Sequence, residues 1–151
     1  MTGSDQVDKW TGGCLCGAVR YEFEPNDVRN WFCHCRMCQQ FSGAVVTNNL
    51  VVQLNDFRWT KGEPKYYESS KIARRGFCAS CGSSLVFAPL HDDYLCIQMG
   101  TMDDPELCPP KGHYGIEGHI SWLPIDANLE ITRTEDDPWF QEQVAQANRN
   151  D

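Results

Sequence analysis

Short runs in which apolar and polar residues alternate recur along the chain and predict β-strands. The clearest run is 18–23, with the sequence AVRYEF, which places three large apolar side chains on one face and two charged side chains on the other. A period of two is typical of a strand with one buried face. Further runs with strand character lie at 30–33, 45–46, 50–54, 57–59 and 94–99.

Little helix is expected between these strands. One helical turn is predicted at 38–42 and a second, capped turn at 102–107, while 121–125 and 129–131 are expected to be short closing elements. Asn48-Asn49 is expected to separate two short strands, since asparagine favours turns. The fold is therefore predicted to be mainly β, built from small antiparallel sheets.

The chain shows no linker, internal repeat or second hydrophobic core, so residues 1–151 are predicted to form one domain with a core at about 10–133. The segment 134–151 is acidic and then rich in Gln and Asn. We expect it to be a tail that frays beyond about Gln143. A chain of 151 residues buries roughly 70% of the surface that its unfolded form exposes, so folding need not depend wholly on metal.

The formal charge of the chain is −8 at pH 7, and thiolate-bound metal would make it more negative. Nucleic acids and anionic membranes bind basic surfaces, so neither is an expected partner. The chain also lacks the C-x-x-C…H-x-x-x-H pattern of DNA-binding zinc fingers. No apolar run approaches the roughly 20 residues needed to cross a membrane.

Three cysteines within six residues, Cys33-His34-Cys35-Arg36-Met37-Cys38, form the densest chemical motif. In an extended backbone Cys33 and Cys35 point to the same face while His34 points to the other. The two residues before Cys38 fit a tight turn, which brings the third sulfur toward the first two. Three converging sulfurs make most of a tetrahedral zinc site, whose fourth position is either open to water or substrate, as in catalytic zinc, or closed by a distant ligand. The spacing leaves both arrangements open.

Two more cysteine pairs predict a second metal site. Cys14 and Cys16 form a C-x-C pair, while Cys78 and Cys81 form a C-x-x-C pair followed by Gly82. The glycine can take the positive φ that the turn of a zinc knuckle often needs. Seven cysteines divide most simply into a closed four-cysteine structural site and the three-cysteine site, giving two zinc ions per chain.

Disulfides are the competing explanation for a chain with nine cysteines. The odd count and a length that does not require covalent staples both disfavour them. The first ten residues are polar and resemble no signal peptide, so we expect a cytoplasmic protein. Cys96 lies in an apolar run and is interpreted as a buried thiol, and Cys108 receives no role.

Taken together, these motifs resemble the glutathione-dependent formaldehyde-activating enzyme family, whose domain is shared with centromere protein V. The residues that carry the resemblance are 13–21, 33–38, 42–43, 57–59 with Gly62, and 75–85. The likeness covers roughly 12–128, although 112–119 follows the C-terminal pattern of the family only loosely. It implies a tent-like arrangement of small β-sheets.

The resemblance also implies roles for the cysteines. The positions that match the structural zinc of the family are Cys14, Cys16, Cys78 and Cys81, and those that match a second, catalysis-linked zinc are Cys33, Cys35 and Cys38. The implied activity is that of a carbon–sulfur lyase, which joins glutathione and formaldehyde as S-hydroxymethylglutathione. Two alternatives remain open, namely a non-catalytic zinc module that binds a protein partner and an enzyme of the same fold that uses another small electrophile.

Glutathione is negatively charged, so a negative protein needs local cations to bind it. The candidates are Arg36, inside the three-cysteine motif, and Arg74 and Arg75, before the knuckle. His34 could orient the metal site from behind the cysteines or be a histidine packed in the core, and we favour the packed role.

Two other histidines, His113 and His119, are weaker candidates for proton transfer at a pocket rim. Three tryptophans are expected in the core, namely Trp31, Trp59 and Trp122.

Overall fold

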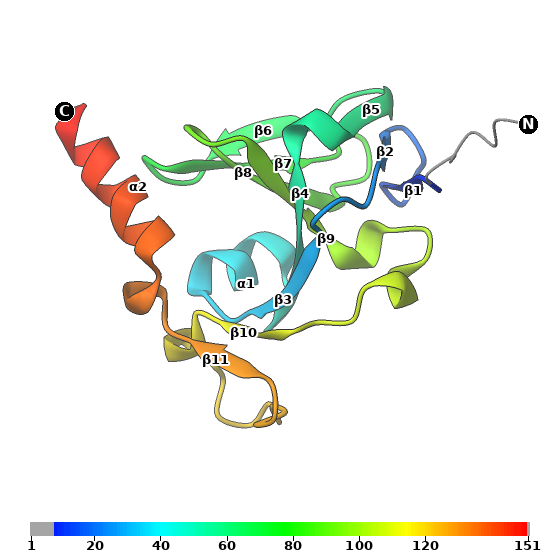
Figure 1. Cartoon of the computed structure of the whole chain (residues 1–151). Helices are drawn as coiled ribbons and strands as arrows, with labels where there is room; N and C mark the ends of the chain where they lie inside the picture. The colour runs from blue at the N-terminus through cyan, green and yellow to red at the C-terminus, as the bar shows by residue number, and fades with distance from the viewer. Residues whose placement is uncertain (1–7, 151) are drawn as a thin grey trace, which may run out of the picture.

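Eleven strands in two sheets form the framework of residues 8–150, the part of the chain that the computed structural model describes (Figure 1). The three-stranded sheet has the order β1-β2-β5, with β1 at Trp10–Gly13, β2 at Arg20–Phe23 and β5 at Phe57–Lys61. The eight-stranded sheet has the order β11-β10-β3-β4-β9-β8-β7-β6. Its strands are β3 (Arg29–Cys33), β4 (Thr47–Gln53), β6 (Lys65–Glu68), β7 (Ala73–Phe77), β8 (Ser84–Pro89), β9 (Tyr94–Gln98), β10 (Gly112–Tyr114) and β11 (Glu130–Thr132).

The described residues include two α-helices, α1 at Arg36–Ser42 and α2 at Pro138–Arg149. Short 3₁₀ turns lie at Leu54–Asp56 (η1), Met99–Thr101 (η2), Pro105–Leu107 (η3), Ile116–Gly118 (η4) and Thr134–Asp136 (η5). The prediction of a mainly β fold is confirmed. No helix in the described range has the length and apolar character to traverse a bilayer.

Alternation along the strands gives the large sheet two different faces. Leu50 and Val52 of β4 are buried in the hydrophobic core together with Tyr21 and Phe23 of β2. The intervening residues of β4 face the other side, where α1 and α2 lie (Figure 1). The core is therefore on one face of the large sheet, and the opposite face is free to build a cavity.

Strand pairing differs from the prediction in two places. β4 runs without a break from Thr47 to Gln53, because Asn48 and Asn49 pair with Phe32 and Trp31 of β3 and so are held in the sheet. In addition, β10 pairs parallel with both β3 and β11, whereas the predicted sheets were antiparallel. The three-residue strand β10 carries too little apolar alternation to be recognised in the sequence, whereas β11 overlaps the short closing element predicted at 129–131.

The C-terminal segment is helical where we predicted a frayed tail. α2 extends through Arg149, and Gln143 and Ala147 are buried against the rest of the chain. Asp137 caps the helix by accepting a hydrogen bond from the Trp139 amide at 3.0 Å. The prediction for Trp122 is also wrong, because 70% of its surface is exposed.

Candidate metal centre

Three cysteine sulfurs converge where β3 meets α1. Cys33 ends the strand, Cys35 is the extended N-cap of the helix, and Cys38 lies in the first turn. The Cys33 and Cys35 sulfurs are 3.5 Å apart, and all three sulfurs lie within 4.8 Å of one another. Sulfurs around tetrahedral zinc are separated by about 3.8 Å at the usual Zn–S length, so the donor set fits zinc.

The three-cysteine cluster has no fourth protein donor of the usual kind in the described range. Among residues 8–150, no His, Cys, Asp or Glu ligand atom joins the cluster within 4.8 Å. Cys33 and Cys38 are buried, and Cys35 is half-buried. The cluster therefore has the composition of a three-ligand site with a position for a further ligand.

A buried arginine donates to this cluster. The Arg75 Nη1 atom lies 3.2 Å from the Cys38 sulfur, and its Nε atom lies 3.1 Å from the Ser69 hydroxyl. The guanidinium also lies near the rings of Phe41 and Phe87, at 5.6 and 5.2 Å. Hydrogen bonds from Cys33 and Cys35, followed by the charge of Arg75, lower the pKa of Cys38 to about 2. Cys38 is thus held as a thiolate, which is the form that binds metal.

A glutamine that the sequence did not reveal fixes the corner between β3 and α1. The Gln39 Nε2 atom donates to the carbonyl oxygens of His34 at 3.0 Å, Val45 at 3.2 Å and Gly118 at 2.9 Å. Gln39 itself is buried. These bonds tie the strand–helix corner, and hence Cys35, to the loop that follows α1 and to the distant segment at Gly118.

The histidines lie behind the cysteines and do not reach a pocket rim. His34 is fully buried, and its Nε2 atom lies 2.9 Å from Nδ1 of His113. His113 is also buried, so its prediction as a rim residue is wrong. Burial lowers the pKa of His34 to about 4, which leaves a neutral ring and agrees with its interpretation as a packed histidine.

The remaining four motif cysteines form a second cluster that bridges the two sheets. Cys14 and Cys16 lie in the β1–β2 loop, and Cys78 and Cys81 lie in the β7–β8 turn, with all four sulfurs within 4.8 Å. The Cys14–Cys16 and Cys16–Cys78 sulfurs are 3.6 and 3.8 Å apart, again a spacing that fits zinc. Gly82 has a φ of +76°, the left-handed conformation expected of the knuckle turn.

A cavity of about 940 Å³ opens from the three-cysteine cluster across the free face of the large sheet. This volume lies within the range of sites that bind small molecules and cofactors. Its wall includes all three cysteines and six aromatic side chains, which are Trp31, Phe87, Tyr94, Tyr114, Trp139 and Phe140. The alternation of β4, which places Asn49, Val51 and Gln53 on this face, could have indicated such a surface in the sequence.

Of the three arginines predicted to bind substrate, two face the cavity and one lies on the opposite face of β7. Arg75 and the exposed Arg36 both line the cavity, as does Arg29. Arg74 points to the other face of β7, where its guanidinium lies 3.8 Å from the centre of the Tyr66 ring. Cys96 is a buried thiol in the cavity wall, as its apolar surroundings in the sequence predicted.

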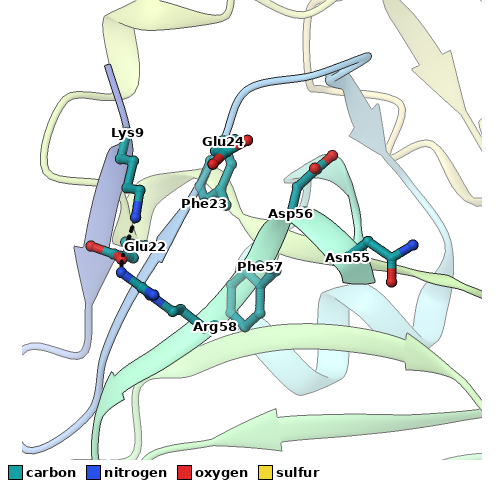
Figure 2. A pocket seen from close by; sticks show the side chains of 8 residues that line it. All are labelled: Lys9, Glu22, Phe23, Glu24, Asn55, Asp56, Phe57 and Arg58. Carbon is teal, nitrogen blue, oxygen red and sulfur yellow. Dashed lines mark hydrogen bonds and ion pairs between the residues drawn. The ribbon is translucent and has the colours of Figure 1, made fainter. Parts of the chain in front are cut away.

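A second hollow, shown in Figure 2, lies on the small sheet and is lined mainly by charged residues, of which Lys9 and Arg58 both pair with Glu22. Glu22 accepts from Lys9 at 3.1 Å and also pairs with Arg58. The hollow has a volume of only about 110 Å³. Both cations of the hollow are therefore paired with Glu22, and we assign the hollow no ligand.

Comparisons with known proteins include a matching family model, a similar curated protein and a similar solved structure. The family model described as glutathione-dependent formaldehyde-activating enzyme matches residues 9–117. A protein of Schizosaccharomyces pombe named as an uncharacterized lyase is 28% identical over 82 residues, which make up 54% of this chain and 59% of the relative. The chain thus spans about three fifths of the length of that relative. A Rhodobacter sphaeroides protein of known structure matches with a TM-score of 0.50 at 23% identity, over 62% of this chain and 87% of that one, a likeness of fold.

Proposed function

The chain belongs to the glutathione-dependent formaldehyde-activating enzyme family, and from this premise we propose that it is a zinc-dependent carbon–sulfur lyase. Its substrates would be glutathione or a similar small thiol and an aldehyde. The observation that carries the proposal is the three-cysteine cluster, which lacks a fourth donor among residues 8–150 and lies in the wall of a cavity. The S. pombe relative, named as a lyase, supports the same class of reaction.

The proposal assigns zinc to both cysteine clusters. Cys33, Cys35 and Cys38 would hold the catalytic ion, and the ion held by Cys14, Cys16, Cys78 and Cys81 would be structural. A catalytic zinc binds an incoming thiol as the thiolate at neutral pH, which makes it nucleophilic. The free thiols of both clusters suit a reducing compartment, and we therefore propose the cytoplasm.

The residues of the chain would position the substrates. Arg75 places a positive charge beside Cys38 and offsets part of the negative charge that three thiolates bring together. Arg36 and Arg29 line the cavity and can pair with the carboxylates of a peptide thiol. The cavity would hold thiol and aldehyde side by side, so that proximity contributes to the rate.

The reaction itself is a reversible addition. The thiol sulfur bonds to the carbonyl carbon, the carbonyl π electrons move to oxygen, and the proton that the thiol has lost ends on that oxygen. No oxidant or reductant is needed. The reverse reaction breaks the carbon–sulfur bond, which makes the enzyme class a lyase.

The test replaces the metal of the three-cysteine cluster by Co²⁺ and follows thiol binding by visible absorption. Adding glutathione to the full-length protein is expected to change the cobalt–thiolate absorption, and Cys35→Ser is expected to abolish the change. Exchange NMR with glutathione and carbon-labelled formaldehyde then measures formation of the adduct. Cys108→Ser, outside both clusters, serves as the control. A cobalt spectrum that glutathione leaves unchanged would refute the thiol site, and an adduct rate equal to the uncatalysed rate would refute formaldehyde as the electrophile.

A further inference from the structure

The floor of the cavity extends well beyond the cysteine cluster. Cys33 pairs with Thr47 at one end of β4, and Gln53 pairs with Tyr94 at the other. Between them, β4 advances six residues, or roughly 20 Å at the usual rise of a strand. Tyr94 and the three cysteines line the same cavity. The metal cluster is therefore at one end of an elongated site.

The far end of this site is built by aromatic side chains that the C-terminal helix supplies. The Trp139 ring packs edge-on against Tyr94, with the ring centres 5.6 Å apart at 62°. Its indole N–H donates to the Asp92 carboxylate at 2.7 Å, which fixes the orientation of the ring. Phe140 and Val51 line the same cavity. We call the surface formed by Val51, Tyr94, Trp139 and Phe140 the distal lobe.

Building on the proposed function, we propose that the distal lobe binds an apolar, aromatic group carried by the electrophile that the thiol attacks. Glutathione spans only roughly 13 Å when fully extended, counting about 3.6 Å for each of its three residues and two further carbons for its γ-glutamyl linkage. Formaldehyde adds only a single carbon. The adduct of these two compounds would leave part of the floor uncovered, whereas an aldehyde that bears a ring would cover it.

The chemistry of the lobe selects such a group. Aromatic side chains pack well against another ring, edge to face or offset, and they offer few partners for charged groups. Burying the apolar surface of the ligand adds affinity in proportion to the area removed from water. Arg36 and Arg75 line the wall near the cysteine cluster and remain available for the carboxylates of the thiol, whereas Arg29 pairs with Val51 at the edge of the lobe. The substrate class is therefore an aromatic aldehyde, which adds the thiol across its carbonyl in the balanced step given above.

The distal lobe also depends on residues that lie outside the segment matched by the family model. The family model ends at residue 117, whereas Trp139 and Phe140 lie on α2. The family match alone therefore does not specify the distal lobe, and a preference for aromatic substrates is a property of this chain.

The test measures binding of three probes to the zinc-loaded, full-length protein by titration calorimetry. The probes are S-methylglutathione, S-naphthylmethylglutathione and naphthylmethanol. We expect the naphthyl conjugate to bind about tenfold more tightly than the methyl conjugate, as burial of a ring predicts. Trp139→Ala and Phe140→Ala should each lower this ratio about fivefold, and the exposed Trp122 provides the control, Trp122→Ala, in which the ratio should be unchanged. Circular dichroism checks that each variant is folded.

The outcomes separate the lobe from the proposed function. If S-methylglutathione binds and the naphthyl group adds no affinity, the distal lobe is refuted while the thiol site stands. If neither conjugate binds but naphthylmethanol does, and Trp139→Ala weakens it, the lobe is supported. The thiol site is then judged by the cobalt titration with free glutathione, because the alkylated sulfur of the conjugates cannot form a thiolate. A ratio that both Trp139→Ala and Phe140→Ala leave unchanged refutes the lobe, because the ring then binds elsewhere.

Discussion

Arg75 combines burial with a sulfur partner, and this makes it the most informative single residue of the candidate site. Its guanidinium donates to Cys38 and lies between two aromatic rings. A buried cation of this kind favours the thiolate form of its neighbour. Groups that support metal ligands in this way commonly change metal affinity when they are removed, although they do not bind the metal themselves.

Replacing Arg75 by methionine is therefore expected to weaken zinc binding at the three-cysteine cluster by about 10- to 100-fold. The charge that offsets the three thiolates is lost, while methionine retains much of the side-chain volume. Competition with a chromophoric chelator measures the zinc affinity. Arg74→Met is the matched control, because Arg74 is exposed and lies over Tyr66 on the other face of the same strand. Equal losses in both variants would show that overall charge, and not the contact with Cys38, determines affinity.

At the residue scale, the sequence predicted which cysteines group together better than it predicted the residues that surround each cysteine cluster. The C-x-C and C-x-x-C spacings are local, so the grouping of cysteines into four and three could be proposed without a structure, and the two sets of sulfurs do converge. The roles of Arg74 and Arg75 could not be separated, because which of two adjacent residues faces the cavity depends on the register of β7. Gln39 was missed for a related reason, since two of its acceptors lie in other loops.

Among the elements, α2 supplies part of the cavity wall and was not recognised in the sequence. Its residues are on average polar, although Phe140, Val144 and Ala147 recur at the i, i+4 and i+7 spacing of one helical face. The sequence did contain a start signal, because Asp137 followed by Pro138 is a favourable N-cap and first position. Packing of Trp139 against Tyr94 then fixes the helix to the sheet, and no pattern confined to 134–151 predicts that contact.

Asp137→Ala is expected to destabilise α2 locally, at a cost of about 1–2 kcal/mol. The Asp137 carboxylate accepts from the Trp139 amide at 3.0 Å and from the Tyr114 hydroxyl at 2.7 Å, so the substitution removes a cap and a tertiary contact. Hydrogen exchange followed by mass spectrometry should show faster exchange in α2 and unchanged exchange in β4 and β9. Glu142→Ala removes only an exposed ion pair with Arg149 and should change little. Faster exchange throughout the sheet would mean that α2 unfolds only together with the core.

A second element-scale contact gives a pH-dependent prediction. Asp103 bonds to Arg20 of β2 and to Thr11 of β1. The pKa of Asp103 is lowered below its ordinary value of 3.8, mainly by the hydrogen bond from the Arg20 guanidinium and less by that from the Thr11 hydroxyl. The folded state thus favours the ionised carboxylate. Its contribution is present above pH 3.8 and is lost as the pH falls through the lowered pKa.

The free energy of unfolding of Asp103→Asn should accordingly be lower than that of the unmodified protein by up to about 1 kcal/mol near neutral pH, a value typical of an exposed pair. This difference should stay constant down to about pH 5 and shrink at lower pH. Urea denaturation at several pH values measures it, and a double-mutant cycle with Arg20→Met isolates the pair. A difference that grows on acidification would contradict the assignment of the ionised form.

For the whole molecule, the two sheets are connected by two different kinds of interaction. The hydrophobic core joins them through side chains of β2 and β4, and this part follows from the alternation visible in the sequence. The four-cysteine cluster joins the β1–β2 loop to the β7–β8 turn, which are 62 residues apart between Cys16 and Cys78. The three-cysteine cluster, by contrast, spans only the β3–α1 corner. The two clusters should therefore differ in their effect on stability.

This difference gives a comparison of two serine substitutions. Cys81→Ser removes a ligand from the cluster that bridges the sheets. The free energy of binding a structural zinc, about 10–16 kcal/mol in small zinc domains, is comparable with the whole stability of a domain, so we expect this variant to lose its cooperative unfolding transition. Cys35→Ser should keep the transition and carry one zinc ion in place of two, because its cluster closes only a local corner. Thermal denaturation and native mass spectrometry measure the two quantities, and Cys108→Ser, outside both clusters, controls for the loss of a thiol. Equal losses of melting temperature in Cys81→Ser and Cys35→Ser would contradict the division, since both ions would then stabilise the fold to the same extent.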